Sequence, residues 1–291
     1  MKIAFIGFGE AARAFRVSLS ARDPGLRFSA YDILLDSEGA EGACAAAMRG
    51  HGVETATSPT HAIASADWIF SAVTADQSLA SVRSVAPHMR AGQVLFDINS
   101  VSPTRKRQSA ALLPPGAYVD MAVMAPVHPK GHATPVLLAG PMDEALLERL
   151  RSLGFAFEIV GREIGSATAI KMVRSLFVKG LEAITVETLL AAQASGCLDT
   201  ILASLAKSYP GLGFPDIARY QFERTTKHGQ RRAAEMRESA ATLDDLGLHG
   251  RLADAIADVQ QAMGDAGNTA GGGPDDLSAT IAAVLAARLA R

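Results

Sequence analysis

The sequence has little cysteine and almost no net charge, and each of these absences excludes a class of protein. The two cysteines, Cys44 and Cys197, form neither a CxxC pair nor a zinc-ligand spacing. A disulfide framework is therefore excluded, and two free thiols in a reducing compartment are expected. The formal net charge of −2 does not fit a nucleic-acid or membrane-surface protein, so any anion site must be local.

Long apolar runs are also missing. No segment reaches the ~20 apolar residues that a helix needs to cross a bilayer. The apolar stretch before Gly7 is too short for the core of a signal peptide and lacks a cleavage site. We therefore expect a cytoplasmic protein with no membrane partner. With 291 residues, 48% of them hydrophobic, the chain can form two domains with sizeable cores.

The first half of the chain alternates short apolar segments with helical patterns. Parallel strands need crossover connections, and helices of this length supply them, so the alternation predicts a mostly parallel, doubly wound α/β sheet. The predicted strands are 2–6, 27–33, 53–57, 67–73, 94–98, 118–123, 136–139 and 155–160.

After Gly161 the strand signal stops. The stretch 264–274, with three consecutive glycines, predicts a flexible loop before the last helix. We therefore predict an α/β domain over residues 1–162 and an all-α domain over 163–291. The predicted helices of the second domain are 166–193, 198–209, 215–245, 251–263 and 277–289.

The first strand ends in the glycine turn "GFGEAA", which opens a helix. Gly7 permits a tight turn, and Gly9 lets the backbone approach a pyrophosphate at the helix N-terminus. Asp32 ends the second strand, where a carboxylate accepts hydrogen bonds from an adenosine ribose. This context favours a Rossmann-type dinucleotide site over a sheet that only looks alike. The expected cofactor-binding residues of this region are Gly7, Phe8, Gly9, Glu10, Ala11 and Asp32.

The same carboxylate bears on the choice of cofactor. Asp32 would repel a 2′-phosphate, and Ile33, Leu34 and Leu35 follow it instead of an arginine, so NAD is favoured over NADP. A distant arginine such as Arg49 leaves NADP possible.

Other strand ends carry further candidates, because ligands of open parallel sheets bind beyond the carboxyl ends of the strands. The fourth strand ends in "SAVTADQS", which adds Val73, Thr74 and Ala75 to the cofactor-binding residues. "DINSVSP" follows the fifth strand, and Asn99 and Ser100 are candidates for catalysis there.

Two alternatives apply at these strand ends. Asn99 and Ser100 could only cap a helix, as Ser102 is expected to do before Pro103. His128, Lys130 and His132 are expected in a surface loop, and no metal site is predicted there.

The long helix predicted at 166–193 is amphipathic. An apolar stripe lies on one side of it and a polar face on another. Helical periodicity by itself predicts that the polar face is exposed to solvent. The stripe contains Ile170, Val173, Phe177, Leu181 and Ile184, and the polar face contains Lys171, Arg174, Ser175, Lys179 and Glu182.

Taken together, "GFGEAA" with "YD", then "DINSVSP", then "GSATAIKMVRS", resemble the β-hydroxyacid dehydrogenase family, which includes 3-hydroxyisobutyrate and 6-phosphogluconate dehydrogenases. The resemblance covers about the first 180 residues. It implies that Lys171 is the general acid/base, with Asn99 and Ser100 beside the nicotinamide and the substrate. Burial and a nearby positive nicotinamide would both lower the pKa of such a lysine.

The resemblance is incomplete at the substrate pocket. The family usually has Ser-Gly-Gly after the sixth strand, where this chain has Met124-Ala125-Pro126, and an asparagine where this chain has Ser175. The acid-binding pocket is therefore rebuilt, and 3-hydroxyisobutyrate itself is a poor expectation. The residues expected to contact substrate are Ser100 and Met124 in the first domain, and Arg174 and Ser175 on the long helix.

"KHGQRRAAEMRESAATLDDLG" resembles the uncharacterised C-terminal domain of some of these dehydrogenases. Its His228 and Arg231 could bind an anionic substrate, or belong to an ordinary charged helix surface. Apolar faces on the long helix and the last helix predict a homodimer through this domain.

The sequence therefore predicts an NAD-dependent dehydrogenase, with NADP possible, acting on a small or medium hydroxy acid or on a related anionic alcohol. Two rivals remain open. One is an NADPH-dependent reductase of an imine or keto acid on the same scaffold. The other is a non-catalytic, nucleotide-sensing module in which Lys171 is only structural.

Overall fold

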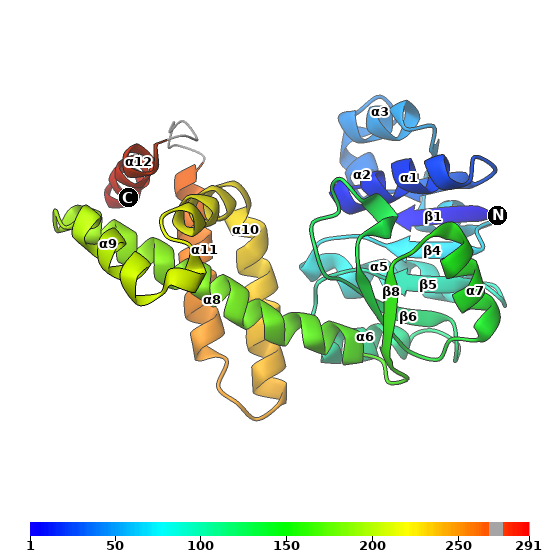
Figure 1. The fold of residues 1–291 in the computed structure, drawn as a ribbon. Coiled ribbons are helices and arrows are strands. Elements are labelled where there is room, and N and C mark those ends of the chain that lie inside the picture. The colour runs from blue at the N-terminus through cyan, green and yellow to red at the C-terminus, as the bar shows by residue number, and fades with distance from the viewer. Residues whose placement is uncertain (268–275, 291) are drawn as a thin grey trace. The chain divides into compact units, whose positions relative to one another are not determined.

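The computed structural model describes residues 1–267 and 276–290, and the chain divides into two compact units, Met1–Lys171 and Met172–Arg291. Figure 1 shows a sheet with flanking helices in the first unit and helices alone in the second. The division falls inside the helix α8, Ser166–Ala194: its first residues belong to the first unit, and the rest is the first helix of the second unit. Over the part of the chain described, no helix has the length and hydropathy needed to cross a membrane.

The first unit is built on an eight-stranded sheet in the order β3-β2-β1-β4-β5-β6-β7-β8. All neighbouring strands pair in parallel except β6 and β7. The chain passes from the β1-β2-β3 half to the β4-β5-β6 half between β1 and β4, which is the switch point where doubly wound folds bind ligands. The strands are β1 Lys2–Ile6, β2 Arg27–Tyr31, β3 Glu54–Thr55, β4 Trp68–Ser71, β5 Val94–Asp97, β6 Tyr118–Val123, β7 Val136–Ala139 and β8 Phe157–Gly161.

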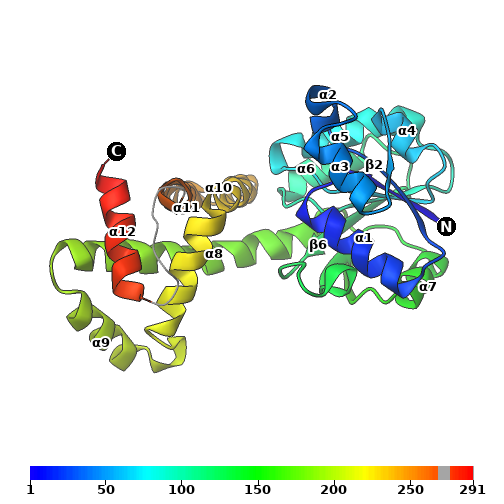
Figure 2. The same ribbon diagram turned by 90° about the horizontal axis from the view of Figure 1, so that it is seen from above.

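Helices cover both faces of this sheet (Figure 2). Residues of α1, α3 and α7 share one apolar core with Phe5, Phe70 and Phe96, and α4, α5 and α6 share a second core on the other face. The predicted doubly wound architecture is confirmed. The helices are α1 Glu10–Arg22, α2 Leu34–Glu38, α3 Ala43–Gly50, α4 Pro59–Ile63, α5 Ser78–Val85, α6 Pro103–Ala110 and α7 Glu144–Leu153, with short 3₁₀ turns η1 Ala75–Gln77, η2 Ala86–His88 and η3 Gly131–Ala133.

The second unit is all-helical, as predicted. α10 and α11 pack so closely that a Cβ on Gly229 would lie 2.2 Å from the carbonyl oxygen of Gln260, and one on Gly264 would lie 2.7 Å from the backbone nitrogen of Gln230. The helices are α8 Ser166–Ala194, α9 Leu198–Ser208, α10 Asp216–Asp245, α11 Arg251–Gly267 and α12 Leu277–Leu289, with the 3₁₀ turn η4 Pro210–Leu212. Of the predicted loop 264–274, residues 264–267 belong to α11, and the remainder lies outside the described residues.

The polar face of α8 differs from the solvated surface expected. Ser175, Lys179 and Glu182 are buried. Lys179 Nζ lies 2.8 Å from Glu235 Oε2, and Glu182 pairs with Arg232 of α10. A buried charged side chain needs a partner of opposite charge, because an isolated charge away from water is unfavourable.

The apolar stripe of α8 is the exposed side of the helix within the second unit. Val173, Phe177 and Ile184 retain 53%, 73% and 67% of their accessible surface. Large apolar side chains aligned on one face in this way are typical of an interaction surface.

Candidate functional site

The glycine turn after β1 is wedged against two neighbouring strands. Gly7 has φ +88°, and a Cβ there would lie 2.3 Å from the carbonyl oxygen of Ala72, which follows β4. Its N–H donates to the carbonyl of Tyr31 at the end of β2, at 2.8 Å. Only glycine fits this position, and the turn therefore lies at the switch point between β1 and β4.

Gly9 leaves the N-terminus of α1 open. It is the N-cap residue, no side chain caps the helix, and no atom lies within 4 Å of the position that a Cβ would take. The first N–H groups of a helix have no intrahelical acceptors, so they are available to an anion. Glu10 is exposed, Ala11 is half-buried, and Ala12 is fully buried at the third glycine position of the motif. These features fit a dinucleotide pyrophosphate.

Asp32 is tied to the same turn. Its Oδ2 accepts a hydrogen bond from the N–H of Phe8 at 2.8 Å, and its Oδ1 accepts one from the N–H of Leu34 at 3.1 Å. The carboxylate is only half-buried, and each oxygen has a further lone pair for a ribose hydroxyl. Nearby, burial and a 2.6 Å hydrogen bond to Asp36 raise the pKa of Tyr31 to about 12, so that hydroxyl stays protonated.

Asn99 joins the loops that follow β4 and β5. Its Oδ1 accepts from the N–H of Val73 at 2.7 Å, and its Nδ2 donates to Ser71 Oγ at 2.8 Å. Both ends of this buried amide are therefore engaged within the protein. Thr74 follows as the N-cap residue of η1, which begins at Ala75. Asn99 holds these residues in place, and its catalytic role stays a prediction.

Lys171 reaches the next residue of this loop. Its Nζ donates to Ser100 Oγ at 2.7 Å, although the two residues are 71 positions apart in sequence. A series of contacts thus connects the glycine turn to the amine: Gly7 adjoins Val73, Val73 bonds to Asn99, and Ser100 follows Asn99. The structure brings the predicted acid/base and the predicted cofactor residues of the first unit to one edge of the sheet.

The first turn of α8 is fixed to the sheet by two side chains. Asp120 of β6 accepts through Oδ2 from the N–H groups of Gly165 and Thr168, both at 3.1 Å. A carboxylate in this position caps the helix and complements its dipole. Thr168 Oγ1 in turn donates to the carbonyl of Val101 at 2.8 Å. Lys171 lies one turn further along α8, so these bonds determine where its side chain starts.

A buried lysine beneath this site was missed by sequence reasoning. Lys106 of α6 is fully buried, and its Nζ lies 3.0 Å from Asp97 Oδ1 and 3.5 Å from Asp120 Oδ1. Tyr118 donates its hydroxyl to Asp97 Oδ2 at 2.7 Å. Burial and the two carboxylates raise the pKa of Tyr118 well above its ordinary value. The run "TRKR" at residues 104–107 is typical of a charged surface, and nothing in its pattern indicates that Lys106 is buried.

The remaining residues expected to contact substrate are divided between the two units. Met124 is half-buried after β6 and packs on Ala122, Ala139 and Ala167. In the second unit Arg174 and Arg231 are exposed, Ser175 is buried and His228 is half-buried. Their contacts with substrate stay predictions.

The expected surface loop 128–132 is only partly at the surface. His128 is exposed, but His132 is buried, with Nδ1 2.7 Å from Ser18 Oγ and Nε2 2.8 Å from the carbonyl of Leu153. The expectation was wrong for His132, because a histidine with both ring nitrogens satisfied can be buried. Its burial lowers its pKa.

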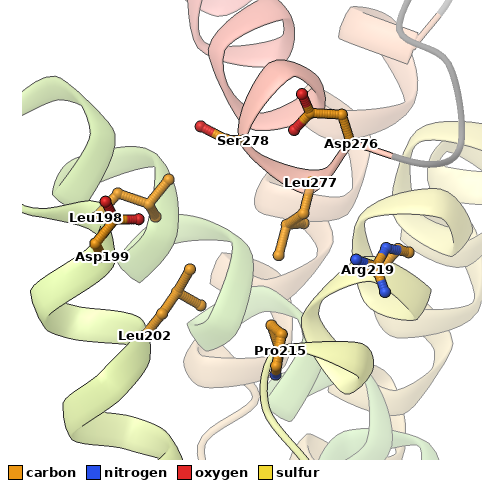
Figure 3. Close-up of a pocket in the computed structure, with 8 residues that line it drawn as sticks. All are labelled: Leu198, Asp199, Leu202, Pro215, Arg219, Asp276, Leu277 and Ser278. Carbon is orange, nitrogen blue, oxygen red and sulfur yellow. The ribbon is translucent and has the colours of Figure 1, made fainter.

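A hollow of about 440 Å³ lies in the second unit, between α9, the start of α10 and the start of α12 (Figure 3). Leucines and a proline form its apolar part. Its charged residues are two aspartates and one arginine, and Arg219 is already paired with Asp216 at 2.9 Å, so the hollow does not favour an anion. It is lined by Leu198, Asp199, Leu202, Pro215, Arg219, Asp276, Leu277 and Ser278.

Two separate parts of the chain match two families. Residues 2–100 match the family described as NADP oxidoreductase coenzyme F420-dependent. Residues 192–263 match a domain of unknown function, DUF1932. The first match agrees with the nucleotide-binding geometry of the glycine turn.

Solved structures extend the likeness to the whole chain. A conserved hypothetical protein from Sinorhizobium meliloti is 36% identical, with 98% of this chain and 96% of that chain covered and a TM-score of 0.75. A conserved protein of unknown function, described as structurally similar to 3-hydroxyacid dehydrogenases, is 29% identical over 90% and 98% of the two chains, with a TM-score of 0.68.

Characterised enzymes share the fold at lower identity. The 3-hydroxyisobutyrate dehydrogenase of Mycobacterium tuberculosis is 19% identical over 97% and 98% of the two chains, with a TM-score of 0.68. An imine reductase of Myxococcus stipitatus, in complex with NADP⁺, is 21% identical over 96% and 98%, with a TM-score of 0.53. Both likenesses establish the fold alone.

Proposed function

We propose that this chain is a nicotinamide-dependent dehydrogenase. It belongs to the β-hydroxyacid dehydrogenase-like family and matches DUF1932 over residues 192–263. Its substrate is a hydroxy acid or a related anionic alcohol. The observation that carries this proposal is the 2.7 Å contact between Lys171 Nζ and Ser100 Oγ, at the sheet edge that also holds the glycine turn.

The cofactor is held by the turn at Gly7 to Ala11 and by Asp32. The open space at Gly9 and the uncapped α1 support binding of its pyrophosphate. When bound there, a nicotinamide cofactor supplies or accepts the hydride.

NAD is the cofactor that the residues around Asp32 favour. Asp32 and Asp36 both lie at this end of β2, and two carboxylates disfavour a 2′-phosphate. Arg49, which left NADP open in the sequence, donates to the carbonyl of Ala40 and pairs with Glu41. Binding titrations with NAD and NADP test this preference, and tighter NADP binding would contradict it.

Lys171 handles the proton of the reaction. During oxidation the hydroxyl carbon loses a hydride while the hydroxyl oxygen gives its proton to the neutral amine of Lys171. Ser100 Oγ accepts a hydrogen bond from the amine and so fixes the direction of its lone pair. In the reverse direction the ammonium polarises the carbonyl and returns the proton.

Replacing the lysine tests the mechanism. Lys171→Met removes the proton acceptor, so turnover should fall by about 10²–10⁴-fold while the affinity for NAD stays near that of the wild type. Lys130→Met is the matched control, since Lys130 is exposed on a loop. The substrate for this assay would be identified by screening hydroxy acids and following the absorbance of the reduced nicotinamide.

The screen also separates the rivals. Turnover only of imines or keto acids with NADPH would replace the dehydrogenase by a reductase on the same fold. Normal turnover by Lys171→Met would reject the proton-transfer role, and nucleotide binding with no turnover of any substrate would leave a sensing module.

A second copy of this chain is the partner proposed for the exposed stripe of α8. The polar face of the helix is already covered by α10 within the unit, so Val173, Phe177 and Ile184 are the side still to be buried. An uncharged stripe can pair with itself across a two-fold axis. Light scattering should give twice the chain mass, and Phe177→Glu should give the monomer. A monomeric wild type would remove this proposal.

A further inference from the structure

Lys106, Asp97 and Asp120 form a buried cluster. Asp97 bonds to the loop that carries Ser100, and Asp120 bonds to the first turn of the helix that carries Lys171. All three side chains are fully buried. One ammonium faces two carboxylates, 3.0 Å from Asp97 Oδ1 and 3.5 Å from Asp120 Oδ1, and it also donates to the carbonyl of Asp97. Burial of two carboxylates is tolerated only with such a counter-charge and further donors.

The first carboxylate supports the loop that carries Ser100. Asp97 ends β5, and its Oδ1 accepts from the N–H of Asn99 at 2.9 Å. Its Oδ2 accepts from Tyr118, whose raised pKa keeps that hydroxyl a donor. Because Ser100 directly follows Asn99, the position of Asp97 sets the position of Ser100.

The second carboxylate supports the helix that carries Lys171. Asp120 pairs with Asp97 in register across β5 and β6, and its Oδ2 holds the N–H groups of Gly165 and Thr168. Lys171 is three residues beyond Thr168, on the next turn of α8. A shift of Asp120 therefore moves the origin of the lysine side chain.

We propose that Lys106 is a positioning residue for the acid/base: by bridging Asp97 and Asp120 with one positive charge, it holds the Ser100 loop and the first turn of α8 at a fixed separation. It does not touch substrate or cofactor. The inference rests on the proposed function for its kinetic consequence, but its structural consequence stands independently.

The kinetic test is Lys106→Met, which keeps an unbranched side chain as far as Cε and removes the charged amine. A displaced acid/base loses efficiency in the chemical step, so kcat should fall on the order of 10²-fold. The Michaelis constant for the cofactor should stay within about twofold, because the glycine turn and Asp32 do not contact Lys106. Lys130→Met should match the wild type.

The structural test needs no turnover. Hydrogen exchange followed by mass spectrometry should show faster exchange in the peptide 163–172 of Lys106→Met, because the N–H groups of Gly165 and Thr168 are held by Asp120. Exchange in β1 and α1 should be unchanged. A wild type without turnover would defeat the proposed function, whereas this exchange comparison would still decide the positioning role.

A second variant covers the case in which Lys106→Met does not fold. Lys106→Met combined with Asp120→Asn leaves no unpaired charge at Asp120 and keeps an oxygen to accept from α8. Because a neutral amide accepts less strongly than a carboxylate, exchange in 163–172 should still be faster and kcat still lower. Unchanged exchange in this peptide, or wild-type kcat, in whichever variant folds would overturn the proposal.

Discussion

Alanine at Gly7 should destabilise the first unit, and the structure sets the size of the effect. The left-handed conformation at φ +88° costs a non-glycine residue about 1–2 kcal/mol. A Cβ only 2.3 Å from the carbonyl oxygen of Ala72 also forces backbone to move, and overpacking of this kind costs about 1–3 kcal/mol. Together they predict a loss of roughly 2–5 kcal/mol.

Alanine at Gly9 is the matched control for that substitution. Gly9 has φ −81°, and no atom lies within 4 Å of the new Cβ, so stability should stay the same or rise by about 0.4–1 kcal/mol. The added methyl would nevertheless occupy the space through which a pyrophosphate approaches the N-terminus of α1. Gly9→Ala should therefore weaken NAD binding without unfolding the protein.

Thermal unfolding without cofactor and calorimetric titration with NAD measure the two effects. At about 2–4 °C per kcal/mol, Gly7→Ala should lower the melting temperature of the first unit by roughly 4–20 °C. Equal stability of Gly7→Ala and wild type would refute the steric argument. Unaltered NAD affinity in Gly9→Ala would refute the assignment of the glycine turn to the pyrophosphate.

Two further substitutions test neighbouring parts of the first unit. Asp32→Asn keeps one acceptor, for the N–H of Phe8, loses the acceptor for the N–H of Leu34 and removes the negative charge. The ratio of NADP to NAD affinity should therefore rise about tenfold, as titrations with both cofactors would measure. An unchanged ratio would show that Asp32 does not select the cofactor. His132, held between Ser18 and Leu153, has a lowered pKa, so the unfolded chain binds its proton first, at its ordinary pKa of 6.5. The stability that neutral His132 contributes is therefore present above about pH 6.5 and is lost as the pH falls through the lower native pKa. Urea unfolding from pH 8 to pH 5 should show a smaller acid loss in His132→Gln, and an equal loss would contradict this reasoning.

The elements could be predicted from the sequence because each carries a local signal. Lys2–Ile6 is a short apolar run ended by glycine, and Ser102 before Pro103 caps α6 as expected, with its hydroxyl accepting from the N–H of Arg105. The acid/base role expected for Lys171 came instead from a family resemblance, because periodicity alone places Lys171 on a solvated face. Local signals therefore determined the fold better than they determined the site.

What the sequence could not predict depends on pairing between distant residues. Lys106 lies in "TRKR", and only the neighbouring strands β5 and β6 bring two carboxylates to its ammonium. Lys179 and Glu182 are buried for the same reason, because their partners are on α10. Hydrophobic periodicity places charged residues at the surface and cannot detect such compensated charges.

The order of the parts of the site along the chain determines when each of them is synthesised. The glycine turn, the hydrogen bond between Asn99 and Val73, and Ser100 all lie within the first hundred residues. Lys171 follows 71 residues after Ser100. β7 and β8 run back along β6, so that Gly161 is level with Ala139 and Asp120 when α8 begins. During synthesis the glycine turn and the Ser100 loop can therefore fold before Lys171 has been made.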